Sequence, residues 1–181
     1  MDYQTQIQNF TDEQLATLID DETATETLGL EADKIRRENY GNEVYVRGLI
    51  EFSNYCKNDC YYCGIRKGNR KADRYRLSFD DILSCCEEGF ALGFRTFVLQ
   101  GGEDPWYTDE KVCQIVSAIK ERFPECAVTL SIGEKSKESY QRFKDAGADR
   151  YLLRHETASE EHYRYLHPES LSLANRKQCL Y

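Results

Sequence analysis

From residue 44 onward, short runs of β-branched and apolar residues alternate with longer stretches in which apolar residues recur at helical spacing. Such a strand–helix repeat is typical of parallel strands joined by right-handed crossover helices. The predicted strands cover 44–52, 96–99, 127–132 and 151–153. The predicted helices begin after Ser78, after Thr108 and after Ser172, and a further one presents Tyr140, Phe143 and Ala146 on its inner face. We therefore expect an α/β fold with about four parallel units.

Four β/α units make half of a (β/α)8 TIM-type barrel, and this half-barrel is the favoured architecture. A stand-alone, doubly wound sheet of four strands is the alternative. The sequence stops inside the last predicted helix without a polar tail, so we expect a truncated barrel. Residues 1–43 are charged and helical in pattern, with Thr11 as a predicted N-cap and a second helix over 22–37. The expected domains are an N-terminal helical cap, 1–43, and the half-barrel, 44–181.

Composition excludes some classes of partner. The chain has 24 basic and 32 acidic residues and a net charge of -8, which argues against a nucleic acid because phosphate binding needs a dense basic field. No segment approaches the roughly 18 apolar residues that a membrane span needs. The polar start, Met1 to Gln4, does not resemble a secretory signal. We therefore expect a cytoplasmic protein that binds neither nucleic acid nor membrane.

Three of the eight cysteines form a compact motif directly after the first predicted strand. Cys56, Cys60 and Cys63 have the spacing CxxxCxxC. Three thiolates cannot complete the four-fold ligation of a cubane iron–sulfur cluster, so one iron is left open for another ligand. Structural zinc with a distant fourth ligand is the alternative, although zinc sites usually show paired doublets. The other cysteines are expected to be small buried residues: Cys85, Cys86, Cys113, Cys126 and Cys179.

The motif, with an aromatic residue at Tyr62, resembles that of the radical S-adenosylmethionine (SAM) superfamily. Longer stretches resemble the HydE family of FeFe-hydrogenase maturases within that superfamily; they cover 48–55, 98–105, 129–134 and 149–157. Methylornithine synthase and biotin synthase share much of this framework. The resemblance implies an enzyme with a 4Fe-4S cluster that reductively cleaves SAM to a 5'-deoxyadenosyl radical. It also implies a role in assembling the diiron, dithiolate-bridged subcluster of FeFe-hydrogenase.

The resemblance further implies which residues bind the cofactors and the substrate. The three motif cysteines would hold the cluster. Around SAM we expect Tyr62, Gly101, Gly102, Glu103, Ser131, Glu156 and Arg176, the last on the SAM carboxylate. Thr129 and Arg154 are expected near the substrate inside the barrel, which Ser131 would also face. Simpler interpretations of these residues stay open. Glu103 could be a solvated residue in a tight turn, and Arg176 a solvated residue on a frayed helix. Thr129 and Ser131 could belong to an ordinary half-buried strand.

The three histidines carry weaker expectations. His155 lies beside Arg154 and Glu156 and is either an acid or base near neutral pH or a hydrogen-bonding residue behind the site. His162 and His167 are expected at the surface.

A run of basic residues over 66–76 is either a solvated loop or a docking patch for an acidic electron donor, such as a flavodoxin or ferredoxin. The other expected partners are a small-molecule or organometallic substrate and further hydrogenase maturation proteins. A related radical SAM enzyme of the methylornithine synthase or biotin synthase type is the first alternative function, and a non-catalytic zinc-binding scaffold is the second.

Overall fold

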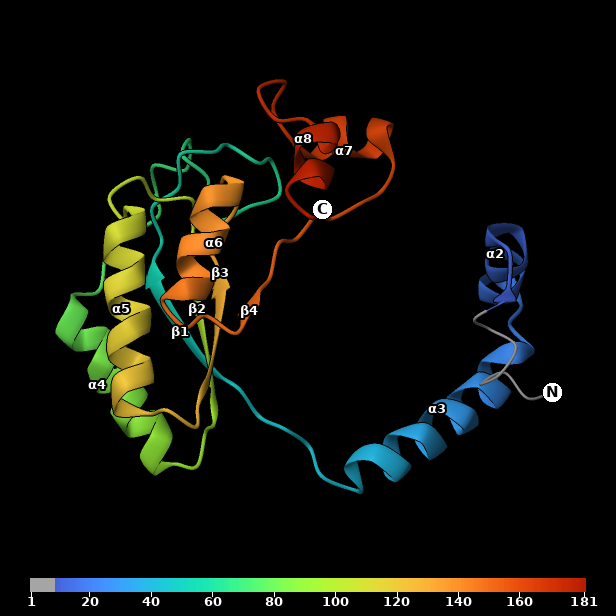
Figure 1. The fold of residues 1–181 in the computed structure, drawn as a ribbon. Coiled ribbons are helices and arrows are strands. Elements are labelled where there is room, and N and C mark those ends of the chain that lie inside the picture. The colour runs from blue at the N-terminus through green and yellow to red at the C-terminus, as the bar shows by residue number, and fades with distance from the viewer. Residues whose placement is uncertain (1–8) are drawn as a thin grey trace. The chain divides into compact units, whose positions relative to one another are not determined.

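A computed structural model describes residues 9–181, and Figure 1 shows its elements along the chain. The polar start considered above, Met1 to Gln4, lies outside the described residues. The chain divides into two compact units, Met1–Tyr45 and Val46–Tyr181. None of the described helices is long and apolar enough to cross a membrane.

The first unit contains helices α2 (Asp12–Asp20) and α3 (Ala24–Tyr40). Thr11 caps α2, as expected from the sequence, because its hydroxyl accepts from the Gln14 N–H while the Gln14 side chain accepts from the Thr11 N–H at 2.8 Å. The chain leaves α3 at Gly41, whose φ of 62° favours glycine. Both predicted helices are therefore present, and the role of this unit as a cap stays a prediction.

The second unit contains one sheet of four parallel strands in the order β1-β2-β3-β4. The strands are β1 (Gly48–Ser53), β2 (Thr96–Gly101), β3 (Ala127–Ser131) and β4 (Arg150–Tyr151). The first strand is shorter than predicted. The backbone of Val44, Tyr45 and Val46 is not part of a strand, and their apolar side chains are exposed. The prediction of four parallel strands is confirmed.

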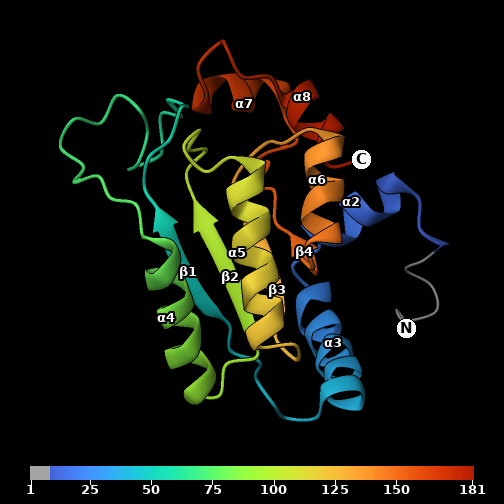
Figure 2. The same cartoon turned by 60° about the vertical axis from the view of Figure 1, so that its left-hand side comes forward.

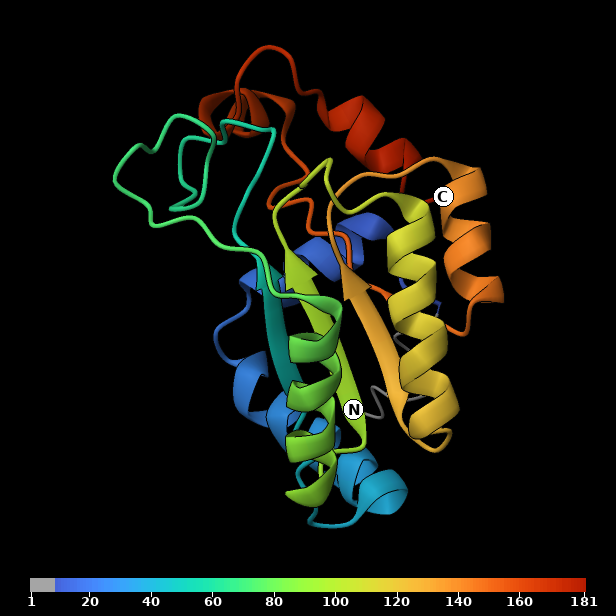
Figure 3. The same cartoon turned by 90° about the vertical axis from the view of Figure 1, so that its left-hand side faces the viewer.

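Helices α4 (Phe79–Ala91), α5 (Asp109–Arg122) and α6 (Lys137–Asp145) cover one face of this sheet (Figures 2 and 3). The core between them is apolar and includes Ile50, Phe52, Ile82, Phe97, Leu99, Val128, Leu130 and Phe143. Strands in chain order with all crossover helices on one face are the arrangement of a barrel, whereas a doubly wound sheet has helices on both faces. The half-barrel prediction is confirmed and the doubly wound alternative is wrong.

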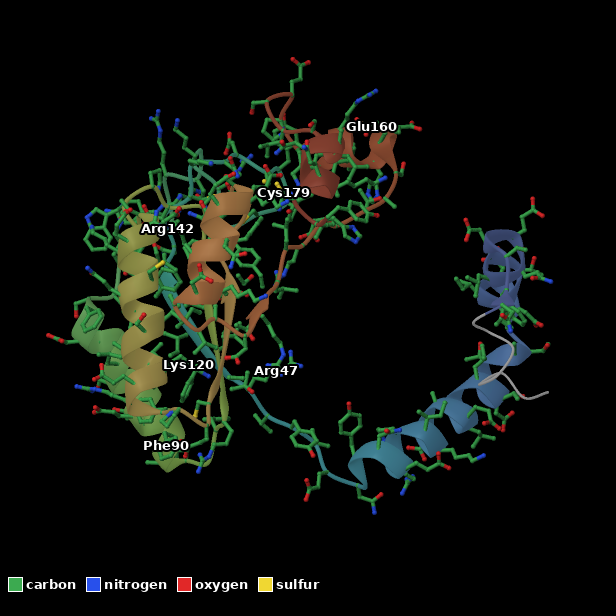
Figure 4. The ribbon with its side chains drawn as sticks, in the orientation of Figure 1. Arg47, Phe90, Lys120, Arg142, Glu160 and Cys179 are labelled. Carbon is green, nitrogen blue, oxygen red and sulfur yellow. The ribbon has the colours of Figure 1, made fainter. Side chains whose placement is uncertain are left out.

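Local sequence signals explain where these helices begin and what they bury. Ser78 and Asp81 form a reciprocal capping box at the start of α4. The predicted apolar face of α5 is buried: Val112, Ile115, Val116 and Ile119. At the surface, Arg142 of α6, labelled in Figure 4, pairs with Glu110 of α5 at 2.7 Å.

Two short helices, α7 (Glu160–Leu166) and α8 (Leu173–Gln178), lie beyond the carboxyl ends of the strands (Figures 1–3). The start of α8 after Ser172 was expected, but α7 was missed. Its signal is local: the Ser159 hydroxyl accepts from the His162 N–H, and Glu160 and Glu161 follow in the first turn.

Two expectations about burial are wrong. Cys86 and Cys126 are buried and Cys113 and Cys179 half-buried, but Cys85 is exposed because it lies on the solvent side of α4. His167 was expected at the surface, yet only 3% of it is exposed. Its ring stacks on Tyr163, with centroids 3.9 Å apart, and its Nδ1 lies 2.9 Å from the Tyr163 carbonyl oxygen. An isolated histidine carries no pattern that predicts such a contact.

One ion pair, with a buried carboxylate, joins the loops that follow β1 and β2. The Asp104 side chain is 2% exposed and accepts from Arg76 Nε at 2.6 Å and from the Ser53 hydroxyl at 2.6 Å. The Arg76 guanidinium also lies over the Tyr55 ring, 3.9 Å from its centroid. Although burial opposes ionisation of Asp104, hydrogen bonds from Arg76 and Ser53 hold its pKa below the ordinary value of 3.8.

Asp104→Asn should lower the free energy of unfolding by roughly 1–3 kcal/mol at pH 7, because it leaves the Arg76 charge without its partner. A carboxylate with a lowered pKa contributes stability above pH 3.8, and that contribution is lost as the pH falls through the folded-state pKa. The difference between wild type and variant should therefore shrink in acid. Urea melts from pH 7 to pH 3 measure this, with the exposed Asp73→Asn as the matched control; a pH-independent difference would contradict the assignment.

Candidate active site

A cavity of about 350 Å³ lies at the carboxyl ends of the strands, where β/α barrels hold their active sites. Its wall is formed by the carboxyl ends of β1, β2 and β3, by the loops that follow all four strands and by one residue of α8. Of the twelve site residues expected from the sequence, eleven line it: Cys56, Cys60, Cys63, Tyr62, Gly101, Gly102, Glu103, Ser131, Arg154, Glu156 and Arg176. The structure thus brings together side chains that are up to 120 residues apart in the sequence.

The cysteine loop is held by its own backbone, by α7 and by one arginine. The Cys63 N–H donates to the Cys60 carbonyl at 3.1 Å, and the Tyr61 N–H donates to Leu166 of α7 at 2.9 Å. Arg74 donates to four backbone carbonyls of the same region, those of Asn54, Ile65, Arg66 and Asn69. The loop has no regular secondary structure, but several of its main-chain carbonyl oxygens accept hydrogen bonds from Arg74 and from the loop's own N–H groups.

The three cysteines are free, half-buried thiols that line the same cavity. Burial, together with the nearby sulfurs of Cys56 and Cys63, raises the pKa of Cys60 to about 11. Burial also raises the pKa of Cys56. Three thiolates this close need a compensating positive charge, which a metal centre provides.

Three cysteine side chains that line one cavity match the donor set of a 4Fe-4S cluster with one open iron. In such a cubane each thiolate binds a different iron, so the sulfurs surround a shared body. The three cysteines therefore fit a 4Fe-4S cluster.

Gly102 allows the loop after β2 to lie against the cysteine loop. A Cβ atom at this position would lie 2.2 Å from the Tyr55 carbonyl oxygen and 2.8 Å from the Cys56 Cβ. The Gly102 N–H donates to the Ser53 carbonyl at 3.2 Å, and the Lys57 N–H donates to the Glu103 carbonyl at 2.9 Å. Only glycine fits this close approach.

The side chains of Glu103 and Arg176 are both largely buried, so the alternative interpretation of each as a solvated residue is wrong. The Glu103 side chain is 10% exposed and lies 3.2 Å from Lys57 Nζ. The Arg176 side chain is 9% exposed, with its Nε 2.7 Å from Glu134 Oε1. Although burial opposes its charge, the Glu134 carboxylate raises the pKa of Arg176. A buried carboxylate and a buried guanidinium thus border the cavity as fixed, opposite charges.

The remaining expected residues differ in how they lie. Glu156 has a φ of 65° and is the one non-glycine residue with positive φ among residues 9–181, a strain that is commonly found at functional sites. Ser131 lines the cavity at the end of β3, and Arg154 donates to Gln100 Oε1 at 3.3 Å. Thr129 does not line the cavity; it is 6% exposed, and its hydroxyl has no hydrogen-bond partner within the described part of the chain.

Several residues of the site were not predicted. Glu134 pairs with Arg176, and Lys57 pairs with Glu103. His167 Nε2 lies 3.4 Å from the Tyr62 hydroxyl, behind the cysteine loop. Glu134 ends the stretch 129–134, which carries part of the resemblance to the HydE family, so its place in the site could have been predicted from the sequence. His155, in contrast, is exposed and does not line the cavity.

Comparisons with known proteins agree with this site. The chain is 46% identical to the FeFe-hydrogenase maturase subunit HydE of Thermotoga maritima over 165 residues, which are 91% of this chain and 47% of that protein. The crystal structure of methylornithine synthase (PylB) superposes with a TM-score of 0.80 and 30% identity, over 94% of this chain and 51% of that one. The structure of HydG, a maturase of FeFe-hydrogenase, gives a TM-score of 0.83 and 25% identity over 94% and 39%.

These relatives confirm the resemblance that the sequence motifs indicated. The chain spans about half the length of the curated relatives it matches. The family model for the radical SAM superfamily matches residues 50–180, which include the three motif cysteines and most of the chain. The chain therefore belongs to the radical SAM superfamily.

Proposed function

We propose that this chain carries the SAM-cleaving site of a HydE-type maturase, which acts in assembling the diiron, dithiolate-bridged subcluster of FeFe-hydrogenase. The observation that carries the proposal is the single cavity that combines three free cysteines with a buried, oppositely charged pair of side chains. Its substrate would be a small or organometallic molecule, and other hydrogenase maturation proteins would be partners. The higher identity to HydE, 46% against 31% for a methylornithine synthase, favours this reading over related radical SAM reactions.

Radical SAM enzymes use a 4Fe-4S cluster and SAM, and these are the chain's cofactors. When bound and reduced, the cluster supplies the electron that cleaves the SAM sulfonium to methionine and a 5'-deoxyadenosyl radical. We assign Cys56, Cys60 and Cys63 to the cluster. With all eight cysteines free, a reducing cytoplasm is the compartment that we propose.

The protein's own residues would bind and orient the cofactor. The Arg176 guanidinium is suited to a carboxylate, and the Glu103 carboxylate to an ammonium group. Both charges are held by the protein before a ligand arrives, so little reorganisation accompanies binding. We assign Tyr62, Gly101, Gly102, Ser131 and Glu156 to the remaining contacts with SAM. Thr129 and Arg154 are kept as substrate residues, although only Arg154 lines the cavity.

Cys60→Ala should abolish both the cluster and SAM cleavage, because two thiolates cannot hold the cubane. After anaerobic reconstitution with iron and sulfide, wild type should show the visible absorption of a cluster and release 5'-deoxyadenosine after dithionite reduction. Cys85→Ala is the matched control, since Cys85 is exposed and distant in sequence from the motif. Unchanged 5'-deoxyadenosine release in Cys60→Ala, or a colourless zinc-loaded wild type, would refute the proposal.

We also propose that an acidic electron donor, such as a flavodoxin or ferredoxin, docks on the cysteine loop. Residues 57–76 carry seven basic and two acidic side chains in a chain whose net charge is -8. Arg74 and Arg76 have structural partners, but no ion pair joins Lys67, Arg70 or Lys71 to an acidic residue within the described chain. These cations follow Cys63 closely and lie on a loop that Arg74 immobilises.

Reversing two of these charges, Arg70→Glu with Lys71→Glu, should slow reduction by an acidic protein donor about 10-fold or more at low ionic strength. The rate of that step should also lose much of its salt dependence. SAM cleavage driven by dithionite should be unchanged, since a small reductant needs no docking surface. Lys137→Glu with Lys144→Glu, on α6, is the matched control, and equal rates for the two double variants would exclude this surface.

A further inference from the structure

The Glu134 side chain lies behind Arg176 and touches two neighbouring residues of α8. Its Oε1 is 2.7 Å from Arg176 Nε, and its Oε2 accepts from Asn175 Nδ2 at 2.6 Å. The side chain is 15% exposed. Both carboxylate oxygens of Glu134 thus contact side chains of α8, and Glu134 does not line the cavity.

The other nitrogens of the guanidinium are held unequally. Arg176 NH1 donates to the Arg154 carbonyl at 3.0 Å. Arg176 NH2 lies 3.9 Å from Glu103 Oε1, which is too long for a hydrogen bond. Arg176 Nε lies 2.7 Å from Glu134 Oε1 as an ion pair, without a hydrogen bond to any of residues 9–181, and the Tyr163 side chain also interacts with the guanidinium. NH2 borders the gap to Glu103 and is the nitrogen that we assign to a ligand.

Glu103 is the nearest competitor for that nitrogen. Its Oε2 lies 3.2 Å from Lys57 Nζ, and its Oε1 accepts from the Glu134 N–H at 3.1 Å. If the guanidinium turned to close the gap of 3.9 Å, Arg176 and Glu103 would neutralise each other. Neither would then be available to a zwitterionic ligand, which needs a separate cation and anion.

We infer that Glu134 is a positioning residue, which holds Arg176 apart from Glu103 so that NH2 faces the carboxylate of the bound ligand. It acts at two points: its carboxylate retains Nε, and its backbone N–H retains Glu103 Oε1. Gly133 makes the second contact possible, because a Cβ there would lie 2.0 Å from the Glu103 side chain. The inference rests on the proposed function, in which that ligand is SAM.

The test compares SAM with its decarboxylated analogue, which keeps the ammonium and the sulfonium nucleoside but lacks the carboxylate. Binding to the whole reconstituted chain is measured by anaerobic equilibrium dialysis, without turnover. Glu134→Ala should weaken SAM binding about 10-fold or more, because it removes the carboxylate that pairs with Arg176 Nε at 2.7 Å and leaves the guanidinium free to turn toward Glu103. Binding of the analogue should change by less than about two-fold, because no carboxylate contact is at stake. Glu134→Gln, which keeps the shape but not the charge, should fall between wild type and Glu134→Ala.

Arg176→Ala should lose the same preference for SAM over its analogue, and the double variant should lose no more than Arg176→Ala alone. Glu125→Ala, an exposed glutamate, is the control and should bind both ligands as wild type does. Equal weakening of both ligands in Glu134→Ala and in Glu134→Gln, or unchanged binding of both, would overturn the positioning role. A wild-type chain that failed to prefer SAM over the analogue would instead overturn the underlying proposed function and this inference with it.

Discussion

The close contact between the loops that follow β1 and β2 is the constraint on which the rest of the site depends. Gly102 lies against Tyr55 and Cys56 with no space for a side chain. The Asp104 carboxylate, two residues on, joins the same two loops through Ser53 and Arg76. These contacts place the first cysteine beside Glu103. A shift of this interface would move the three sulfurs and the Glu103 carboxylate together, because both are carried by the same pair of loops.

Charge is balanced around the cavity before any cofactor is considered. Glu103 and Glu134 are opposed by Lys57 and Arg176, and three of these side chains are at most 15% exposed. Buried charges are tolerated only when they are paired in this way. The pairing leaves the Arg176 and Glu103 ends 3.9 Å apart instead of joined, so the balanced set still presents a positive and a negative edge to the cavity.

The sequence predicts those parts of the structure that depend on local signals. The α5 face is read from helical spacing, the α4 start from the capping box at Ser78, and the cysteine motif from its spacing alone. What it misses are contacts between distant segments. Glu134 is ordinary in the sequence and acquires its role only when α8 brings Arg176 to within 2.7 Å. The His167 ring packs against the rings of Tyr163 and Tyr62, and no periodic pattern in the sequence predicts these contacts. Thr129 and Ser131 share a strand face, but only Ser131 lines the cavity. The alternation of side chains predicts which face a residue is on, but not how far along the strand the cavity begins.

A second polar arrangement crosses the face of the sheet opposite α4, α5 and α6. Gln100 of β2 donates to Glu51 of β1 at 3.0 Å, and Arg154 donates to Gln100 at 3.3 Å. Glu51 and Gln100 are register partners in adjacent strands, so their side chains leave the same face of the sheet. The strand ends and loops therefore supply the sulfur ligands and buried charges, whereas the strand face supplies a row of amide, carboxylate and guanidinium groups. Arg154 belongs to this row, and its carbonyl also accepts from Arg176, so it contacts both the row and the guanidinium. Because Glu51, Gln100 and Arg154 line the same cavity as the three cysteines, the polar face of the sheet forms one wall of the site.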